Sequence, residues 1–220
     1  MLICILGRGA SGKDTLKSYL MNHFSSLKEL PLFTTRPQRP NESNDAYLWA
    51  RANPDNYIIH IQNSQIDIFD DNYVETRSYE TVHGTWLYGT TTPSVHTVDG
   101  KTIDLYDLTK DNYIAATVPG QLKKYVEEYG KENIAVIYLN CPRDICESRM
   151  RKRDASDPEE VTRRLLSDDK DYGNDAIDEI KHMGLNAVTL FVCENDTPLD
   201  LMENLIITNF WKKLDIPETL

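Results

Sequence analysis

A glycine-rich stretch near the N-terminus has the residue types and the spacing of a phosphate-binding loop. Residues 7–15 read Gly-Arg-Gly-Ala-Ser-Gly-Lys-Asp-Thr. Glycines let successive backbone N–H groups curl around an anion, and the lysine adds a positive charge where the β- and γ-phosphates of a nucleotide would lie. We call residues 7–15 the glycine loop and predict that it binds nucleotide phosphates. The expected binding residues are Gly7, Gly9, Ala10, Ser11, Gly12, Lys13, Asp14 and Thr15.

The residue after the lysine departs from the common pattern of such loops. Most carry Ser or Thr there, whose hydroxyl reaches Mg²⁺, whereas this chain has Asp14 followed by Thr15. A carboxylate is a good Mg²⁺ ligand but repels phosphate, so Asp14 either acts through a water molecule or points away. We expect Mg²⁺ as a cofactor and name Asp14 and Thr15 as its candidate ligands.

A second cationic segment follows at residues 34–42, Thr-Thr-Arg-Pro-Gln-Arg-Pro-Asn-Glu. It places Arg36 and Arg39 close together on a proline-stiffened loop. Arginine binds phosphate through two parallel hydrogen bonds and keeps its charge, and the prolines reduce the entropy lost on ordering. We predict a second phosphate site here. The alternative is a solvated basic loop on an acidic protein.

A third cationic group lies on a helix that is expected to begin at Pro142. Arg149 and Arg153 are four residues apart and so share one face of that helix. Polar residues interrupt the pattern at 154–160, and a second helix from about Pro158 carries Arg163 and Arg164. The break suggests a mobile lid at about residues 149–165, whereas the alternative is an ordinary solvated helix surface.

The elements around these segments predict an α/β fold. Buried apolar runs indicate strands at 2–6, 112–118, 134–139 and 187–193, and helical patterns follow at 12–24, 119–129, 142 onward, 158 onward, 174–183 and 198–214. Strands that alternate with helices favour a parallel sheet with helices on both faces and ligands at the carboxyl ends of the strands.

A β-rich insertion interrupts this alternation. A short strand is expected at 28–33, a loop at 34–44 and short, mostly antiparallel strands from 47 to 92. Residues 95–105 indicate a hairpin, in which Asp99-Gly100 suits a two-residue turn with positive φ. The domain prediction is a core at 1–33 and 109–220 and an insertion at 34–108.

The composition limits the partners and the compartment. A net charge of −11 opposes a nucleic-acid-coating surface or an anionic membrane as partner. The four cysteines lack zinc-finger spacing, and Cys4 and Cys193 lie in apolar runs that suit core thiols. No apolar run is long enough to span a bilayer, and the N-terminus has no targeting pattern. We expect a soluble cytoplasmic protein.

Taken together, these motifs resemble the guanylate kinase family over nearly the whole chain. The glycine loop is followed by Thr-Thr-Arg-x-x-Arg-x-x-Glu at 34–42 and by Tyr-Gly-Thr at 88–90. The resemblance implies a P-loop NTPase fold with a nucleotide-binding insertion and a helical lid, and it implies GMP as phosphoryl acceptor. Its site residues for the acceptor would be Arg36, Arg39, Tyr47 and Tyr88 around the phosphate. Thr90 belongs to the matching Tyr-Gly-Thr element, and Glu75 would read the N1 and N2 edge of guanine.

The same resemblance implies an ATP site and catalytic residues. The arginines of the lid match Arg149, Arg153 and Arg164, which would act with Lys13 on the ATP phosphates. Such residues suit phosphoryl transfer, in which catalysis is mostly positioning and neutralisation of charge. Asn195, after the last strand, matches the asparagine that helps hold adenine.

The sequence departs from the family pattern at three points, and the first two leave the choice of base open. The segment between Glu75 and Tyr88 is longer than the family pattern, so Glu80 is an alternative base reader. Leu32 stands where the family has a base-contacting serine. The family also carries an aspartate at the end of the strand after the insertion. When the motifs are matched, this aspartate is Asp107. When the distance from Arg149 is matched, its position is that of Thr117, and the aspartate is absent.

The expected function is ATP-dependent phosphorylation of a nucleoside monophosphate, most simply GMP or dGMP, by a monomer or homodimer. One alternative is a deoxynucleoside monophosphate kinase with another base preference. The other is a non-catalytic guanylate-kinase-like binding module, whose signature would be loss of Lys13 or of the lid arginines, and both are present.

Overall fold

The computed structural model describes residues 1–39, 42–44, 46–53, 56–68, 71–207 and 210–213. The chain forms two compact units, one made of Met1–Glu29 and Leu108–Leu220 and the other of Leu30–Asp107. The second unit begins four residues earlier than residue 34, because Leu32–Thr34 pairs with a strand of that unit. Within the described ranges, no helix has the length and apolar character needed to cross a membrane.

The first unit is built on a five-stranded sheet in the order β14-β13-β1-β12-β2. Its strands are β1 (Leu2–Gly7), β2 (Leu27–Glu29), β12 (Asn112–Thr117), β13 (Ile134–Asn140) and β14 (Asn186–Phe191), and every adjacent pair is parallel. All six residues of β1 are buried, as expected for a central strand that is covered on both faces. The predicted α/β class with a parallel sheet is confirmed.

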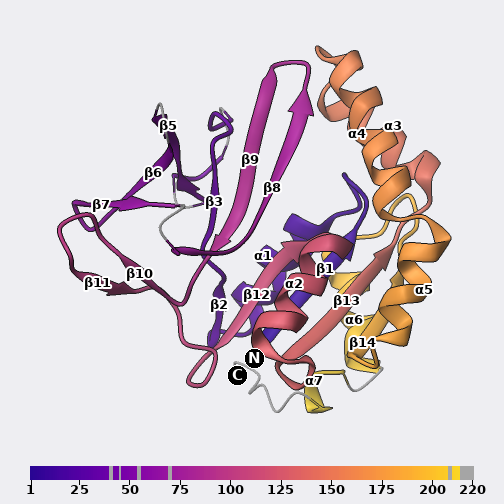
Figure 1. Ribbon diagram of the computed structural model, residues 1–220. Coiled ribbons are helices and arrows are strands. Elements are labelled where there is room, and N and C mark those ends of the chain that lie inside the picture. Colours follow the sequence, from indigo (N-terminus) through magenta and orange to yellow (C-terminus); the bar gives the residue numbers. More distant parts are fainter. Residues whose placement is uncertain (40–41, 45, 54–55, 69–70, 208–209, 214–220) are drawn as a thin grey trace. The chain divides into compact units, whose positions relative to one another are not determined.

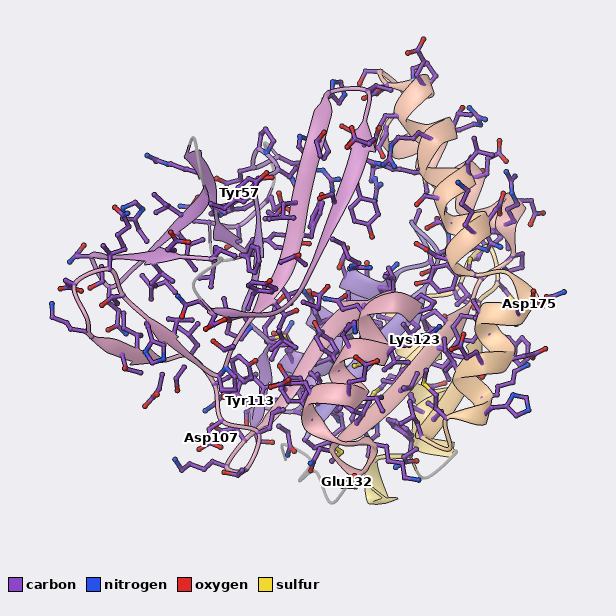
Figure 2. The ribbon with its side chains drawn as sticks, viewed as in Figure 1. Tyr57, Asp107, Tyr113, Lys123, Glu132 and Asp175 are labelled. Carbon is purple, nitrogen blue, oxygen red and sulfur yellow. The ribbon has the colours of Figure 1, made fainter. Side chains whose placement is uncertain are left out.

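Helices cover both faces of this sheet (Figure 1). The α1 (Lys13–His23), α6 (Pro198–Ile207) and α7 (Phe210–Lys213) helices share an apolar cluster with Ile3 and Ile5 of β1. Since side chains alternate along a strand, the remaining apolar residues of β1 point to the opposite face, where α2 (Pro119–Tyr129) lies. There Lys123 of α2, which Figure 2 labels, contacts Glu179 of α5 (Asn174–His182) at 2.6 Å.

Two further helices complete the unit. They are α3 (Arg143–Arg153) and α4 (Pro158–Asp171), with a short 3₁₀ turn, η1 (Lys131–Asn133), before β13. Residues 154–157 interrupt the helical run, a shorter break than the predicted 154–160, and Asp157 caps α4 by accepting a hydrogen bond from the Glu160 N–H. The helix predicted over 198–214 is two helices in the described chain, and residues 208, 209 and 214 lie outside the described residues.

The second unit is all β. Its four-stranded sheet has the order β4-β3-β9-β8, and its three-stranded sheet has the order β5-β6-β7. The strands are β3 (Leu32–Thr34), β4 (Leu48–Trp49), β5 (Arg51–Asn53), β6 (Asn56–Ile61), β7 (Ser64–Asp67), β8 (Tyr73–Thr81) and β9 (Gly84–Thr91), followed by the hairpin β10 (Ser94–His96) and β11 (Thr102–Asp104). A separate apolar core that includes Phe33, Ile59 and Leu87 holds the unit together.

Three local predictions are wrong. The strand expected at 28–33 is two strands in different sheets, because Pro31 interrupts the run and cannot donate a ladder hydrogen bond. The hairpin loop has five residues, since His96 pairs with Thr102, and only Gly100 within it has positive φ. Cys193 is exposed and follows the end of β14, so it is not a core thiol.

Candidate functional site

The glycine loop connects the carboxyl end of β1 with the first turn of α1. Gly12 has φ 99° and Ala10 has φ 59°, so the backbone passes twice through the left-handed region that curls a chain around an anion. The Lys13 ammonium donates to the carbonyl oxygens of Gly7 and, at 2.9 Å, of Arg8. These bonds hold the charge of Lys13 against the loop, where burial lowers the pKa of the ammonium.

A cavity of about 230 Å³ opens at this loop. Three of its lining side chains are cations, from Lys13, Arg149 and Arg153, whereas Asp14 is the one carboxylate of the lining. Ser11 lies on the loop but does not line this cavity; it is only 1% exposed, and its hydroxyl has no hydrogen-bond partner among the described residues. A polyphosphate supplies the acceptors that such a lining lacks, so these residues suit the phosphates of a nucleotide.

An adjoining cavity of about 280 Å³ suits a base. It shares Ala10, Gly12, Thr15 and Arg149 with the first cavity, and its far wall contains Val192, Asp196, Pro198 and Leu201. Apolar walls with a few polar groups are typical of ligand pockets. The predicted residue Asn195 is exposed and is not part of this lining, whereas the neighbouring Asp196 is.

The arginines expected in the lid separate into two groups. Arg149 donates to the carbonyl oxygens of Cys193 at 2.9 Å and Glu194 at 2.8 Å, which ties α3 to the segment after β14. Arg153 and Arg164 instead share the carboxylate of Asp154, at 2.8 Å and 2.9 Å. Arg164 lines neither cavity.

A buried carboxylate holds the α4 arginines in place. Glu160 is 2% exposed and accepts hydrogen bonds from Arg163 at 2.7 Å and 2.8 Å and from Arg164 at 2.9 Å. Burial disfavours the ionised form of Glu160, but the two guanidiniums outweigh that effect and lower its pKa to about 2. Within α4, Glu160 therefore neutralises part of the positive charge of Arg163 and Arg164.

Asp168 and Tyr172, which contact the backbone of the glycine loop, were missed by sequence reasoning. Asp168 of α4 accepts a hydrogen bond from the Gly9 N–H at 2.7 Å, and burial raises the pKa of this carboxyl group although Gly9 and Lys13 oppose the shift. The Tyr172 hydroxyl accepts from the Gly7 N–H at 3.1 Å. The acidic run at 167–171 was visible in the sequence, but nothing local indicated which carboxylate returns to the loop.

The candidate metal ligands lie in the first turn of α1. Asp14 and Thr15 are both exposed there, and Asp14 lines the phosphate-sized cavity. The described residues contain no cluster of three or more His, Cys, Asp or Glu side chains that could hold a metal ion. This donor set still suits Mg²⁺, which is commonly held by one or two protein ligands together with substrate phosphates and water.

The second unit carries the other predicted phosphate residues. Arg36 is 4% exposed, and its guanidinium makes a two-point contact with Glu42, at 2.7 Å and 3.0 Å. The same guanidinium lies 5.5 Å from the ring centroids of Tyr47 and Trp49. Arg39 has an exposed side chain, and its N–H donates to Glu42 at 3.1 Å. Glu42 thus neutralises the charge of Arg36 within the loop that was predicted to bind phosphate.

Most of the predicted acceptor residues gather on one face of the β4-β3-β9-β8 sheet. Glu75 is 5% exposed and accepts from the Thr90 hydroxyl at 2.9 Å. Tyr88, two residues from Thr90 on β9, lies with its ring centroid 6.2 Å from that of Tyr47. We call this surface the acceptor face; its residues are Tyr47, Glu75, Arg77, Tyr79, Tyr88 and Thr90.

The alternative base reader does not belong to this face. Glu80 is exposed and accepts from Thr85 at 2.8 Å, and it lies an odd number of residues from Glu75 on β8, hence on the other side of the sheet. Leu32 pairs with Thr90 across β3 and β9. The strand after the second unit, β12, ends at Thr117, and Asp107 precedes it in an irregular segment, so no aspartate stands at that strand end.

Comparisons with known proteins support the fold. No protein-family model and no curated protein matches the sequence. Among solved structures, guanylate kinase from Anaplasma phagocytophilum matches with a TM-score of 0.54 and 12% sequence identity, over 99% of this chain and 86% of that chain. At this identity the likeness shows the fold alone, which is guanylate kinase-like.

Proposed function

We propose that this chain is an ATP-dependent nucleoside monophosphate kinase that converts GMP or dGMP to the diphosphate. The observation that carries the proposal is the phosphate-sized cavity at the glycine loop, where Lys13, Arg149 and Arg153 converge. A fold similar to that of a guanylate kinase is consistent with it. The proposal extends the domain prediction, since the first unit would hold ATP and the second the acceptor.

On the donor side, the glycine loop holds the phosphates and Lys13 neutralises their charge. The Ser11 hydroxyl offers a buried donor to a phosphate oxygen, and the apolar cavity wall receives the base. Arg149, Arg153 and Arg164 stabilise the charge that spreads over the transferred group, with Asp154 giving up its guanidinium contacts when phosphate replaces it.

Mg²⁺ would be held by Asp14 and Thr15 together with phosphate oxygens. When bound, it would neutralise part of the phosphate charge. The residues of the chain would contribute by positioning the two nucleotides, because phosphoryl transfer needs no covalent intermediate with the protein.

On the acceptor side, Arg36, Arg39, Tyr47 and Tyr88 would bind the monophosphate. Arg36 is already fixed by Glu42 and two aromatic rings, so its guanidinium is positioned before the substrate arrives. Glu75 and Thr90 would read the base.

The test is a panel of ribo- and deoxynucleoside monophosphates incubated with ATP and Mg²⁺, with ADP formation as readout. We expect GMP and dGMP to be the best acceptors. Preference for another base would favour the second kinase hypothesis. Binding of monophosphates without ADP formation would favour the non-catalytic binding module. The absence of both binding and turnover would refute the proposal.

A further inference from the structure

The acceptor face carries a cation that the family resemblance does not assign. Arg77 follows Glu75 by two residues on β8, so both side chains lie on the same face of the sheet. The Arg77 Nε atom is 3.4 Å from Glu75 Oε2, and the Arg77 guanidinium lies 5.7 Å from the ring centroid of Tyr79. The Arg77 side chain is 26% exposed and that of Glu75 only 4%, so Arg77 is the more accessible of the two side chains.

The two side chains together present a defined hydrogen-bonding pattern. A carboxylate only accepts hydrogen bonds and a guanidinium only donates them. Guanine offers O6 and N7 as acceptors, beside N1–H and N2–H as donors, and a bidentate contact from arginine to O6 and N7 is the commonest specific contact to this base. Adenine places the N6 donor beside N7, where it would oppose the guanidinium.

Leu32 strengthens this interpretation. Its backbone pairs with Thr90, whose hydroxyl contacts Glu75, and an aliphatic side chain there offers no donor to a base. A donor for the O6 edge must therefore come from another position of the acceptor face. Cytosine could also pair with an arginine and a carboxylate, but it would offer Glu75 one donor group where guanine offers two.

We propose that Arg77 is a specificity-determining residue, which donates to O6 and N7 of a 6-oxopurine while Glu75 accepts from N1 and N2. The inference rests on the proposed function, because it takes the acceptor face as the site of the monophosphate. It assigns the discrimination against adenine to Arg77 and the discrimination against hypoxanthine, which lacks the 2-amino group, to Glu75.

The experiment measures equilibrium binding of GMP, IMP, AMP, CMP and 7-deaza-GMP, followed by tryptophan fluorescence or equilibrium dialysis. The variants are Arg77→Lys, which keeps a charge beside Glu75 but loses the fork, and Glu75→Gln. Arg51→Lys, at an exposed position on β5, is the matched control. Melting temperatures check that each variant is folded.

We expect Arg77→Lys to reduce the preference for GMP over AMP by roughly ten- to a hundredfold and to abolish the penalty for 7-deaza-GMP. The preference for GMP over IMP should persist in Arg77→Lys and should be lost in Glu75→Gln. An unchanged GMP-to-AMP ratio in folded Arg77→Lys, or tighter wild-type binding of CMP than of GMP, would overturn the inference.

The outcomes also separate the inference from the proposed function. Base-selective binding that depends on Arg77, without phosphoryl transfer, would support the inference and refute the kinase. ADP formation with GMP that does not depend on Arg77 would support the kinase and refute the inference. If the wild-type chain bound none of the monophosphates, both would be refuted.

Discussion

At the scale of single residues, the charge of Lys13 is held in place before any ligand binds. Its ammonium is fixed by two carbonyl oxygens of the loop, so its charge needs little reorganisation during a reaction. We predict that Lys13→Ala lowers the turnover number by about 10²-fold or more, the scale for one preorganised contact, and leaves the fold intact. Steady-state kinetics on the purified variant would measure this.

Lys17→Ala is the matched control for that experiment. Lys17 lies on the same helix but is paired with Glu29, and it lines neither cavity of the first unit. We expect its loss to change stability slightly and turnover little. Equal effects of the two variants would show that Lys13 acts through the helix and not through phosphate.

Asp168 places a negative charge at the same loop. Since burial raises its pKa, the ionised carboxylate is disfavoured in the folded protein, and protonation begins above the ordinary carboxyl range as the pH falls. Asp168→Asn keeps an acceptor for the Gly9 N–H and removes the charge. We predict ATP binding about three- to tenfold tighter at neutral pH, as expected for loss of one repulsion of roughly 1 kcal/mol.

The pH dependence supplies the check on Asp168. The difference in ATP affinity between wild type and Asp168→Asn should shrink as the pH falls, because the wild-type carboxyl group itself becomes neutral. Calorimetric titrations at several pH values would follow it. A difference that stays constant with pH would show that the charge of Asp168 is not the cause.

These two residues show what the sequence can and cannot provide at this scale. Lys13 is identifiable because its role depends on local spacing within the glycine loop. Asp168 is not, because its contact with Gly9 joins positions 159 residues apart and depends on how α4 packs. The same holds for Arg77, whose partner Glu75 is obvious only once β8 is known to be extended.

At the scale of elements, α3 and α4 are joined by a set of ion pairs around Asp154 and Glu160. Breaking a buried pair leaves an uncompensated charge, so Glu160→Gln should lower the free energy of unfolding of the first unit by about 2 kcal/mol at pH 7. Glu159→Gln, on the neighbouring exposed residue, is the control. Urea denaturation followed by circular dichroism measures both variants.

The sign of the pH effect follows from the lowered pKa. The folded pKa of Glu160 is about 2, below the unfolded value of about 4.3, so its stabilisation is complete above about pH 4.3 and is lost as the pH falls toward 2. The difference in the free energy of unfolding between wild type and Glu160→Gln should therefore narrow over that range. A gap that widened on acidification would contradict the ion-pair explanation.

The elements themselves were predictable where the apolar pattern was continuous. The helix over 119–129 and its stop at Gly130 agree with α2, because Pro119 begins the helix and Gly130 has positive φ. The hairpin loop was not predictable from Asp99-Gly100 alone. The Thr97 hydroxyl accepts from the Lys101 N–H at 2.8 Å and so closes a longer loop, which a dipeptide rule cannot anticipate.

At the scale of the whole molecule, carboxylates hold many of the cations that are proposed to bind phosphate. The chain has 35 acidic and 24 basic residues, and Glu42, Asp154 and Glu160 each contact a proposed phosphate-binding arginine. The net charge of −11 therefore does not contradict an anionic substrate. A bound phosphate must instead compete with a carboxylate for the same arginine. Where these groups are exposed, salt weakens their ionic contacts.

The proposed function assigns the two phosphate sites to different units, and their variants should fail differently. Arg39 would grip the acceptor phosphate in the ground and transition states alike, so Arg39→Ala should mainly raise the KM for the acceptor. Arg153 would act as the γ-phosphoryl group leaves ATP, so Arg153→Ala should lower kcat and leave that KM nearly unchanged. Each loss should be about ten- to a hundredfold, or about 1.5 to 3 kcal/mol.

Two other arginines provide controls for this comparison. Arg151 lies on α3 and pairs with Glu147 at 2.7 Å, and Arg51 is exposed on β5. Neither lines a cavity at the glycine loop, so Arg151→Ala and Arg51→Ala should leave both constants near the wild-type values. If Arg39→Ala left the KM for the acceptor untouched while Arg153→Ala raised it, the acceptor would have to bind at the glycine loop, and the assignment of the two units would be reversed.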